Sequence, residues 1–556
     1  MTSVSDYLPQ VLSSYGIDIV FGIVGIPIVE LADKMILQGK IRFIAFRNEQ
    51  AASYAASAYG YLTGKPAVLL VVGGPGVIHA LAGIYNSISN KWPLIVLAGS
   101  SEDRYKGGFQ ELDQVSLLSN YVKFSGKINE SNIDMLVYNA MRLSVVGTPG
   151  VCYLDIPGDV IHKTVPNSKA HEAIPVSAVR FSPDPSAIKN VAALVSKYSS
   201  KRVLCVIGKG AVEYPNELRE FINRFQLPFL PTPMAKGVLP DSSPLNVSSA
   251  RSLALKTADL VLVFGARLNW ILHFGQAPKW KANAIFVQID KTPEELGHNN
   301  QLGTSFALCG DIGLSVKALA QNLSRFKYTG LSQELKDKVK TNEQRLHIKE
   351  ITPAPILNYN QVYAHMRELI IDKDTILVTE GANTMDVARV SFPTDYPKQK
   401  LDAGTNATMG VGLGYAIAAK LAQPQKTVIC IQGDSAFGFS AMELETASRN
   451  ELGLVVVVMN NSGIYHGYVD PEKSTAGPLP PSKLPSTALS YNCRYDLVAR
   501  GLGCDGYLVR TLAELTTEFE KALFHSKRGK TTVLNVVIEP GKQGKLSFGW
   551  QSKAKM

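Results

Sequence analysis

Short apolar runs that alternate with helical patterns are the feature that most restricts how this chain folds. In the N-terminal part of the chain, β-branched runs such as 67–72 are separated by segments of helical character, such as the Ala-rich stretch 49–62. Strands that alternate with helices predict a parallel sheet covered on both faces. The expected strands are 17–24, 43–46, 67–72, 94–98 and 151–156, and the expected helices are 29–38, 49–62 and 77–89.

The same alternation returns twice, which predicts an α/β fold of three consecutive parallel-sheet modules. A Pro- and Ser-rich linker at 165–186 and a charged helical stretch at 331–350 lie between them. We expect an N-terminal module at 1–165, a central module at 188–325, a C-terminal module at 355–545 and a tail at 546–556. The further expected strands are 203–207, 260–264, 284–289, 375–378, 427–432, 454–459 and 532–538.

Composition limits the class of protein. Hydrophobic residues make up 46% of the 556 residues and charged residues 19%, so the chain is not generally disordered. The net charge of +10 is spread out, which favours attraction of an anionic small molecule over binding of nucleic acid. The longest uncharged stretch, between Lys65 and Lys91, is broken by Gly73–Gly76, so no membrane span is expected. Six scattered cysteines, none in a CxxC pair, suggest neither a zinc site nor a disulfide framework.

Two consecutive strands of the C-terminal module end in polar side chains. Gly433-Asp434-Ser435 follows one strand and Asn460-Asn461 follows the next. The carboxyl ends of parallel strands share one edge of a sheet, where α/β folds bind ligands. A carboxylate, an amide oxygen and a backbone carbonyl suit Mg²⁺ bound together with a phosphate, and Gly433 and Gly438 let the backbone approach that phosphate. Alternatively, Asp434 is a helix N-cap and the asparagines form a turn.

This spacing resembles the diphosphate-binding motif of the thiamine diphosphate enzymes. The resemblance implies that Asp434, Asn461 and the carbonyl of Gly463 bind Mg²⁺. It also places Gly433, Ser435 and Ile464 against the cofactor. Ser435 stands where the family usually has glycine, which removes no ligand.

Two further segments carry the same resemblance. Glu49 opens an Ala-rich helix directly after a strand, as the family's catalytic glutamate does, and is therefore expected against N1′ of the aminopyrimidine. Residues 401–410 resemble the segment that meets this ring, with Met409 between the two cofactor rings and the Ala407 carbonyl facing the 4′-amino group. Taken alone, Glu49 would complement a helix dipole and Met409 would be core packing. The modules would then bind the pyrimidine, a nucleotide or CoA, and the diphosphate, in that order.

Several stretches resemble one branch of the family, the 2-hydroxyacyl-CoA lyases and oxalyl-CoA decarboxylases. This implies a thiamine diphosphate- and Mg²⁺-dependent lyase that cleaves a 2-hydroxyacyl-CoA to formyl-CoA and an aldehyde. The alternatives are an oxalyl-CoA decarboxylase that releases CO₂ and a non-catalytic cofactor-binding protein. The acyl chain length stays open. The stretches are 21–27, 108–111, 265–270, 380–386, 437–440 and 463–465.

Polar residues near the expected chemistry complete the candidate site. Gln110 is placed by its motif near the thiazolium, and Tyr465 follows the metal-site loop as a possible proton donor. Glu111 and His466 are further candidates, although a surface position for His466 is equally compatible with the pattern. His79 lies inside a predicted helix, where a structural role is expected.

The central module carries a partial glycine fingerprint, Gly208-Lys209-Gly210, after a strand. This pattern alone is weak because the third glycine is missing. In the branch that the chain resembles, this module binds ADP or the adenosine end of CoA, which would bring Lys209 to a phosphate and Asp290 to a ribose hydroxyl. Alternatively, Lys209 is a solvated charge and Asp290 a turn residue. Whether ADP regulates activity is left open.

Assembly and location are also expected from the resemblance. Glu49 and Asp434 lie on different modules, and in this family such modules come from different subunits, which implies a homodimer or a homotetramer. The last three residues, Ala554-Lys555-Met556, are a variant of the Ser-Lys-Leu peroxisomal address that an import receptor reads. We therefore expect the peroxisomal matrix, with the cytoplasm as the alternative.

Overall fold

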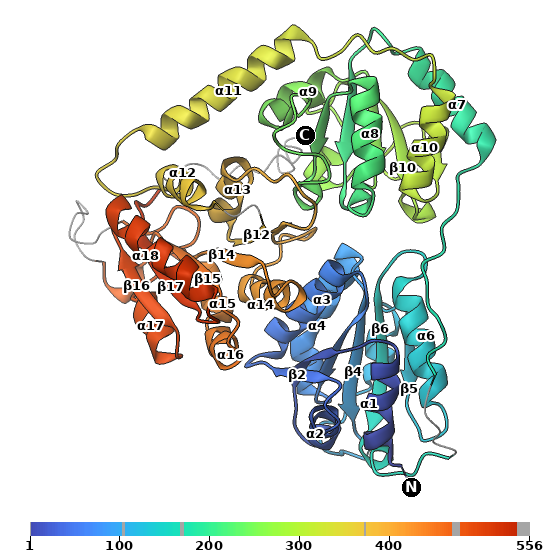
Figure 1. Cartoon of the computed structure of the whole chain (residues 1–556), viewed down its shortest axis with the longest axis vertical. Coiled ribbons are helices and arrows are strands. Elements are labelled where there is room, and N and C mark those ends of the chain that lie inside the picture. The colour runs from blue at the N-terminus through green and yellow to red at the C-terminus, as the bar shows by residue number, and fades with distance from the viewer. Residues whose placement is uncertain (1, 103–105, 167–171, 372–373, 470–478, 542–556) are drawn as a thin grey trace. The chain divides into compact units, whose positions relative to one another are not determined.

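The computed structural model describes residues 2–102, 106–166, 172–371, 374–469 and 479–541 (Figure 1). Three sheets form, and all of their recorded strand pairs are parallel, which confirms the predicted α/β fold. The described chain divides into two compact units. The first combines Met1–Val179, Asp372–Met385 and Asp402–Pro540, and the second contains Arg180–Ile371 and Asp386–Leu401. Ala554-Lys555-Met556 lies outside the described residues, so the peroxisomal address stays a prediction.

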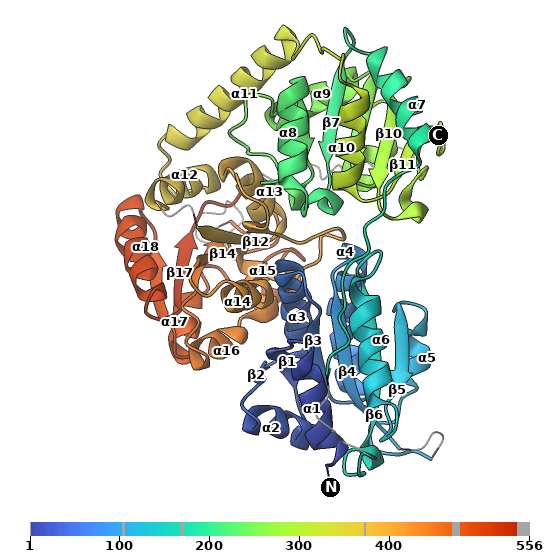
Figure 2. The same cartoon turned by 45° about the vertical axis from the view of Figure 1, so that its right-hand side comes forward.

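The N-terminal sheet has the strand order β2-β1-β3-β4-β6-β5. Helices α1, α2 and α6 cover one face of it, and α3 and α4 lie on the other (Figures 1 and 2). Every residue of β3 and β4 is buried, as expected for strands covered on both sides. The strands are β1 Ile19–Ile23, β2 Arg42–Ala45, β3 Ala67–Val71, β4 Leu94–Ser100, β5 Phe124–Lys127 and β6 Val151–Pro157, and the helices are α1 Val4–Ser14, α2 Val29–Leu37, α3 Glu49–Thr63, α4 Pro75–Asn90, α5 Gln114–Ser119 and α6 Ile133–Val145.

The C-terminal sheet has the order β13-β12-β14-β15-β17-β16. Its central strands β14 and β15 run in register, with Gly433 opposite Met459, so Asp434 and Asn460 emerge at the same edge. The strands are β12 Thr375–Glu380, β13 Lys400–Leu401, β14 Thr427–Gly433, β15 Val455–Asn460, β16 Asp505–Val509 and β17 Thr532–Val537, and the helices are α12 Tyr359–Leu369, α13 Ala382–Ser391, α14 Gly412–Ala422, α15 Asp434–Ser440, α16 Glu443–Arg449, α17 Tyr495–Gly501 and α18 Leu512–Ser526.

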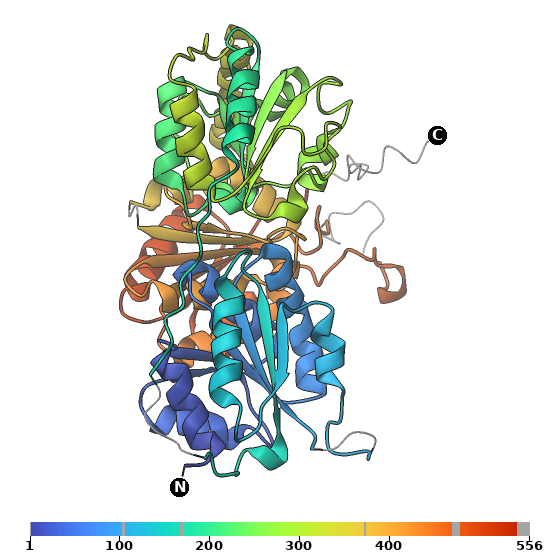
Figure 3. The same ribbon diagram turned by 90° about the vertical axis from the view of Figure 1, so that its right-hand side faces the viewer.

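The central sheet has the order β11-β10-β9-β7-β8. Helices α7, α8 and α10 pack together along this sheet, which is green in Figures 2 and 3. The strands are β7 Val203–Ile207, β8 Phe229–Pro231, β9 Leu260–Phe264, β10 Ile285–Asp290 and β11 Ala307–Cys309, and the helices are α7 Pro185–Ser196, α8 Pro215–Phe225, α9 Arg251–Thr257 and α10 Ile312–Asn322, followed by the charged helix α11 Gln333–Ile351.

Within the first unit, α3 packs against both α4 and α14, which Figure 1 shows side by side. Small residues allow these close crossings. A Cβ added at Gly414 of α14 would lie 2.8 Å from the Ala51 carbonyl oxygen of α3, so any larger residue there would push the helices apart. Asn86 of α4 donates to the Tyr415 hydroxyl at 2.6 Å. These contacts fix the helix that begins at Glu49.

The structure agrees with the sequence on the central strands and differs at the edges. Five short edge strands were not predicted, because few of their positions form a sustained apolar pattern. They are β5, β8, β11, β13 and β16. Helix α4 starts at Pro75, two residues before the expected start, because proline is tolerated in the first helical turn. All six cysteines are free thiols. Among the described residues, no helix is both long enough and apolar enough to span a membrane.

Candidate active site

Glu49 lies at the start of α3, facing the first turn of α4. Asn48 caps α3 by accepting from the backbone N–H of Gln50 at 2.7 Å. The Glu49 side chain is 13% exposed, and its Oε2 lies 3.2 Å from Nδ1 of His79. A Cβ added at Gly76 would lie 3.7 Å from Glu49 Oε1. The carboxylate is therefore largely buried but stays reachable beside a glycine.

His79 is the residue at this site that sequence reasoning placed differently. We expected a structural histidine, but its side chain is 61% exposed and contacts Glu49. The helical pattern predicted that His79 lies on a helix, but it could not predict that Glu49 on α3 lies next to it. Its spacing, three residues after Gly76, was the only available signal.

Gln110 borders the same turn of α4. Its φ of 54° is left-handed, and a Cβ added at Gly74 would lie 2.8 Å from its carbonyl oxygen. Gly74 donates to the buried side chain of Gln114 at 2.6 Å, and Gln114 in turn donates to Asp155 at 2.8 Å. The loop that carries Gln110 is thus fixed beside the helix turn that faces Glu49.

Asp434 is the first residue of α15, and its side chain is almost fully enclosed, with the residue 2% exposed. Its carboxylate accepts from the N–H groups of Ser435 at 2.7 Å and Gly463 at 3.0 Å. Burial raises the pKa of Asp434 to about 6, and backbone hydrogen bonds oppose that rise. In the described part of the chain, no cationic side chain pairs with it. A buried carboxylate in this state favours binding of a cation.

The loop after β15 places the other predicted metal ligands. Asn461 donates through Nδ2 to the carbonyl of Tyr465 at 3.0 Å, which leaves its Oδ1 for a ligand. Asn383 donates to the same carbonyl at 2.7 Å. Ser462 and Tyr465 have left-handed φ values of 62° and 57°. Non-glycine residues rarely hold this conformation, and those that do cluster at functional sites.

The two adjacent asparagines have different roles. Asn460 donates to the Cys493 carbonyl and to Asn535, each at 3.0 Å, so its amide group is used within the fold. Thr487 contacts the loop that follows the asparagines at two points. Gly463 has no room for a side chain, because an added Cβ would lie 2.6 Å from the Thr487 carbonyl oxygen. The backbone N–H of Ile464 donates to the same carbonyl at 2.8 Å. Ile464 is 39% exposed, and His466 follows it in the loop.

The donor set fits a hard divalent cation. Asp434 supplies a carboxylate, Asn461 an amide oxygen and Gly463 a carbonyl. Among the described residues there is no group of three or more His, Cys, Asp or Glu side chains that could hold a metal. Mg²⁺ needs no such group, because it keeps few protein ligands and takes the rest from phosphate and water. A Cβ added at Gly438 would meet open space, which leaves room for a ligand.

Glu380 fixes the loop that carries Ala407 and Met409. This buried carboxylate accepts from the N–H of Gly410 and, at 2.7 Å each, from the N–H of Gly412 and Nε2 of Gln432. Burial raises its pKa to about 7, and these hydrogen bonds act in the opposite direction. Sequence reasoning missed this residue, because its partners lie far along the chain.

The same loop contacts both of the other parts of the site. The Tyr54 hydroxyl of α3 donates to the Met409 carbonyl at 3.4 Å. A Cβ added at Gly410 would lie 3.4 Å from Cβ of Phe439 on α15. Ala407 has a left-handed φ of 51°. The Met409 loop is therefore tied to the helix of Glu49 and to the helix of Asp434.

Lys209 and Asp290 lie in the second unit. Asp290 ends β10 and accepts from Thr292 N–H at 2.9 Å, and Lys209 follows β7. Between them, Gly265 follows β9, which ends at Phe264. A Cβ added at Gly208 would lie 2.2 Å from the Gly265 carbonyl oxygen, and one added at Gly265 would lie 2.7 Å from backbone atoms of Gly210 and Ala211. Both candidates therefore occupy the carboxyl edge of the central sheet.

Comparison with known protein families identifies three matching regions. Residues 2–117 match the N-terminal TPP binding domain of thiamine pyrophosphate enzymes, 188–319 the central domain and 380–536 the C-terminal TPP binding domain. The chain belongs to the thiamine pyrophosphate enzyme family. Thiamine pyrophosphate is thiamine diphosphate, so the expected cofactor is confirmed. As an enzyme of this family, the protein is a thiamine diphosphate-dependent lyase.

Curated relatives extend over nearly the whole enzyme. It is 58% identical to the 2-hydroxyacyl-CoA lyase of Saccharomyces cerevisiae, with 100% of both chains covered. It is 41% identical to 2-hydroxyacyl-CoA lyase 1 of Mus musculus, covering 99% of this chain and 96% of that one. It is 36% identical to the oxalyl-CoA decarboxylase of Escherichia coli, covering 97% and 95%. The predicted branch of the family is confirmed.

Glu380 gives the cofactor-free enzyme a specific pH response. Because its pKa is raised in the folded state, the folded protein holds this proton more tightly than the unfolded chain does. Its contribution to the free energy of unfolding therefore falls as the pH rises between about 4.5 and 7. Glu380→Gln cannot titrate, so we expect its unfolding midpoint to fall less between pH 5 and pH 8 than that of the wild type. Thermal unfolding across this range measures the difference, and parallel curves would contradict it.

Proposed function

We propose that this enzyme cleaves the C1–C2 bond of a 2-hydroxyacyl-CoA to give formyl-CoA and an aldehyde, using thiamine diphosphate and Mg²⁺. The observation that carries this proposal is the 58% identity, over the full length of both chains, to a 2-hydroxyacyl-CoA lyase. The acyl-CoA thioester is the substrate class that both named branches of relatives act on.

Asp434, Asn461 and the carbonyl of Gly463 would hold Mg²⁺ in this proposal. The buried Asp434 carboxylate supports the assignment, and so does Oδ1 of Asn461, which accepts no hydrogen bond from the described residues. Gly433, Ser435 and Ile464 would line the diphosphate. When bound, the cofactor would supply a nucleophilic carbon, and its positively charged thiazolium ring would act as the electron sink.

The remaining predicted residues would orient the cofactor and handle protons. Glu49 would hold a proton at N1′ of the aminopyrimidine, and Ala407 and Met409 would fix the angle between the rings. Gln110 and Tyr465 would face the substrate carbonyl. The left-handed backbone at Gln110, Ala407 and Tyr465 supports the assignment, because such conformations persist where the surrounding structure imposes them.

Product analysis tests the reaction itself. Incubation of the purified holoenzyme with a 2-hydroxyacyl-CoA should give equal amounts of formyl-CoA and aldehyde, and oxalyl-CoA should be turned over far more slowly. Release of CO₂ from oxalyl-CoA as the faster reaction would instead identify an oxalyl-CoA decarboxylase. A protein that binds the cofactor without catalysis would give neither product and would not accelerate deuterium exchange at C2 of the cofactor.

Glu49→Gln should reduce turnover by about 10² or more, the scale expected when an acid or base is lost. Folding and Mg²⁺-dependent cofactor binding should be preserved, because glutamine keeps the size of the side chain and the recorded partner of Glu49 is His79 rather than a predicted metal ligand. Turnover and deuterium exchange at C2 of the bound cofactor measure the loss. Near-wild-type values for both would remove Glu49 from its assigned role.

Asp434→Ala should abolish Mg²⁺-dependent retention of the cofactor, since it deletes the one carboxylate of the metal site. Glu49→Gln serves as the matched control and should retain the cofactor through gel filtration. Retention can be read directly from the thiamine diphosphate content of the protein peak. Cofactor that stays bound to Asp434→Ala, and also survives a chelator, would refute the metal assignment.

The proposal extends to the ligand of the central module, the assembly of the enzyme and its location. Lys209 and Asp290 would contact an adenine nucleotide, either ADP or the adenosine part of CoA, and the close approach of Gly208 to Gly265 supports a backbone cradle there. The enzyme would act as a homodimer or a homotetramer, which light scattering of the holoenzyme checks. Import into the peroxisome through the receptor for the C-terminal address stays part of the proposal.

A further inference from the structure

The connection between β2 and α3, which leads into Glu49, is held by a buried carboxylate of the C-terminal module. Glu443 is the first residue of α16 and is 1% exposed. Its two oxygens lie 3.2 and 3.3 Å from the backbone nitrogen of Arg47, which donates to them. The hydroxyl of Thr446 donates to Oε2 at 2.6 Å and so fixes the rotamer of the carboxylate.

Among the described residues, no cationic side chain forms a direct ion pair with Glu443, although the charge of Arg47 favours its ionised form. Burial raises its pKa to about 7, while hydrogen bonds from Thr446 and from the backbone of Arg47 and Asn48 act in the opposite direction. A buried carboxylate without a paired cation is costly, and its partners here are main-chain N–H groups. The two residues that provide them directly precede Glu49. The contact therefore holds the backbone in place where the chain enters α3.

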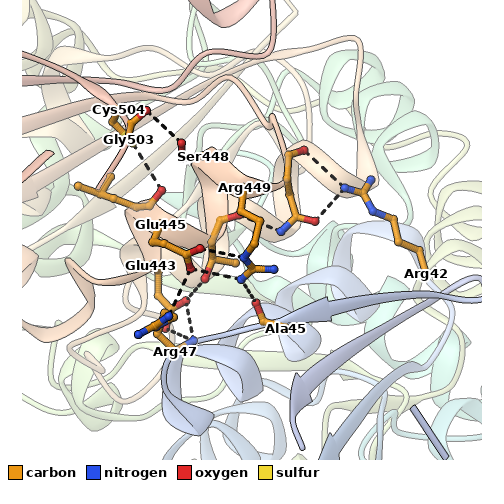
Figure 4. Close-up of polar contacts among 12 residues, drawn as sticks. Arg42, Ala45, Arg47, Glu443, Glu445, Ser448, Arg449, Gly503 and Cys504 are labelled. Carbon is orange, nitrogen blue, oxygen red and sulfur yellow. Dashed lines mark hydrogen bonds and ion pairs between the residues drawn. The ribbon is translucent and has the colours of Figure 1, made fainter. Parts of the chain in front are cut away.

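Neighbouring residues hold the other end of the same connection. Arg449, at the end of α16, donates to the carbonyl of Ala45 in β2 at 2.7 Å and pairs with Glu445 at 2.9 Å. Arg42 donates to Oδ1 of Asn450 at 3.0 Å. Figure 4 shows Glu443 directed toward Arg47 and Arg449 directed toward Ala45, at the two ends of this connection. The segment that leads into Glu49 is thus fixed by α16 as well as by its own module.

We propose that Glu443 is a positioning residue for Glu49. By binding the backbone of Arg47 and Asn48, it sets where α3 begins and therefore where the Glu49 carboxylate stands. The inference rests on the proposed role of Glu49. Misplacement of a reacting group by about 1 Å costs up to about 10² in rate, so loss of a distant backbone contact is expected to be visible.

Two measurements on Glu443→Gln test the proposal. The variant keeps the volume of the side chain but leaves one neutral oxygen, in place of two charged ones, to accept from the main chain and from Thr446. In the cofactor-free protein, amide hydrogen exchange at Arg47 and Asn48 should accelerate by about tenfold or more. In the holoenzyme, deuterium exchange at C2 of thiamine diphosphate should slow by about tenfold or more, while cofactor retention stays at the wild-type level.

A double variant separates positioning from a general structural effect. If Glu443 acts through Glu49, adding Glu443→Gln to Glu49→Gln should slow C2 exchange no further than Glu49→Gln alone. Failure of the proposed role of Glu49 would appear as normal C2 exchange in Glu49→Gln. The amide exchange of the cofactor-free protein would still test the backbone contact on its own.

Two further variants complete the test. Thr446→Val keeps the shape of a buried side chain and removes only the hydroxyl that holds Glu443. It should therefore accelerate amide exchange at Arg47 and Asn48 and slow C2 exchange, as Glu443→Gln does. If Glu443→Gln does not fold, Thr446→Val provides the test. Glu518→Gln, at an exposed ion pair with Lys521 on α18, is the matched control and should change neither. Unchanged amide exchange in Glu443→Gln and Thr446→Val would overturn the proposal. So would faster amide exchange with normal C2 exchange.

Discussion

Three buried carboxylates bind main-chain N–H groups, and the geometry of the candidate site depends on these contacts. Asp434 binds Gly463 in the loop after β15, and Glu380 binds Gly410 and Gly412 beside Met409. Glu443 binds Arg47 at the entry to α3. Each carboxylate lies in the C-terminal module and fixes a segment distant in sequence. Since the N–H groups belong to the backbone, these anchors set the path of the chain whatever side chains the segments carry.

The regular elements were predictable from the sequence because burial leaves a pattern. Strands such as β7 and β9 were located to the residue, since each is a short, wholly buried apolar run between polar segments. The positions of Glu49 and Asp434 at strand-to-helix turns were also predicted, and their roles were assigned by the family resemblance. Both features depend on residues that are close together in the sequence, so the local sequence pattern is enough to predict them.

The anchoring residues were not predictable in the same way. The contacts of three residues, Glu380, Glu443 and His79, are made with partners on other elements. No spacing along the chain indicates which partners these are. Glu443 is separated from Arg47 by 396 residues of sequence, and alone it resembles any acidic residue in a first helical turn. The packing of α3 against α4, the pairing of β12 with β14 and the approach of α16 to β2 bring these groups to their partners.

The three carboxylates also differ in what compensates their burial. Asp434 lies beside a loop whose amide and carbonyl oxygens suit a cation, so a bound metal would offset its desolvation. Glu380 and Glu443 have no such neighbour among the described residues, and their pKa values are raised to about 7. Their burial is a lasting cost to the free energy of folding. Such a cost is offset where the buried carboxylate fixes the backbone of another segment. Here the two fixed segments are the loop of Met409 and the entry to α3, and both carry residues of the candidate site.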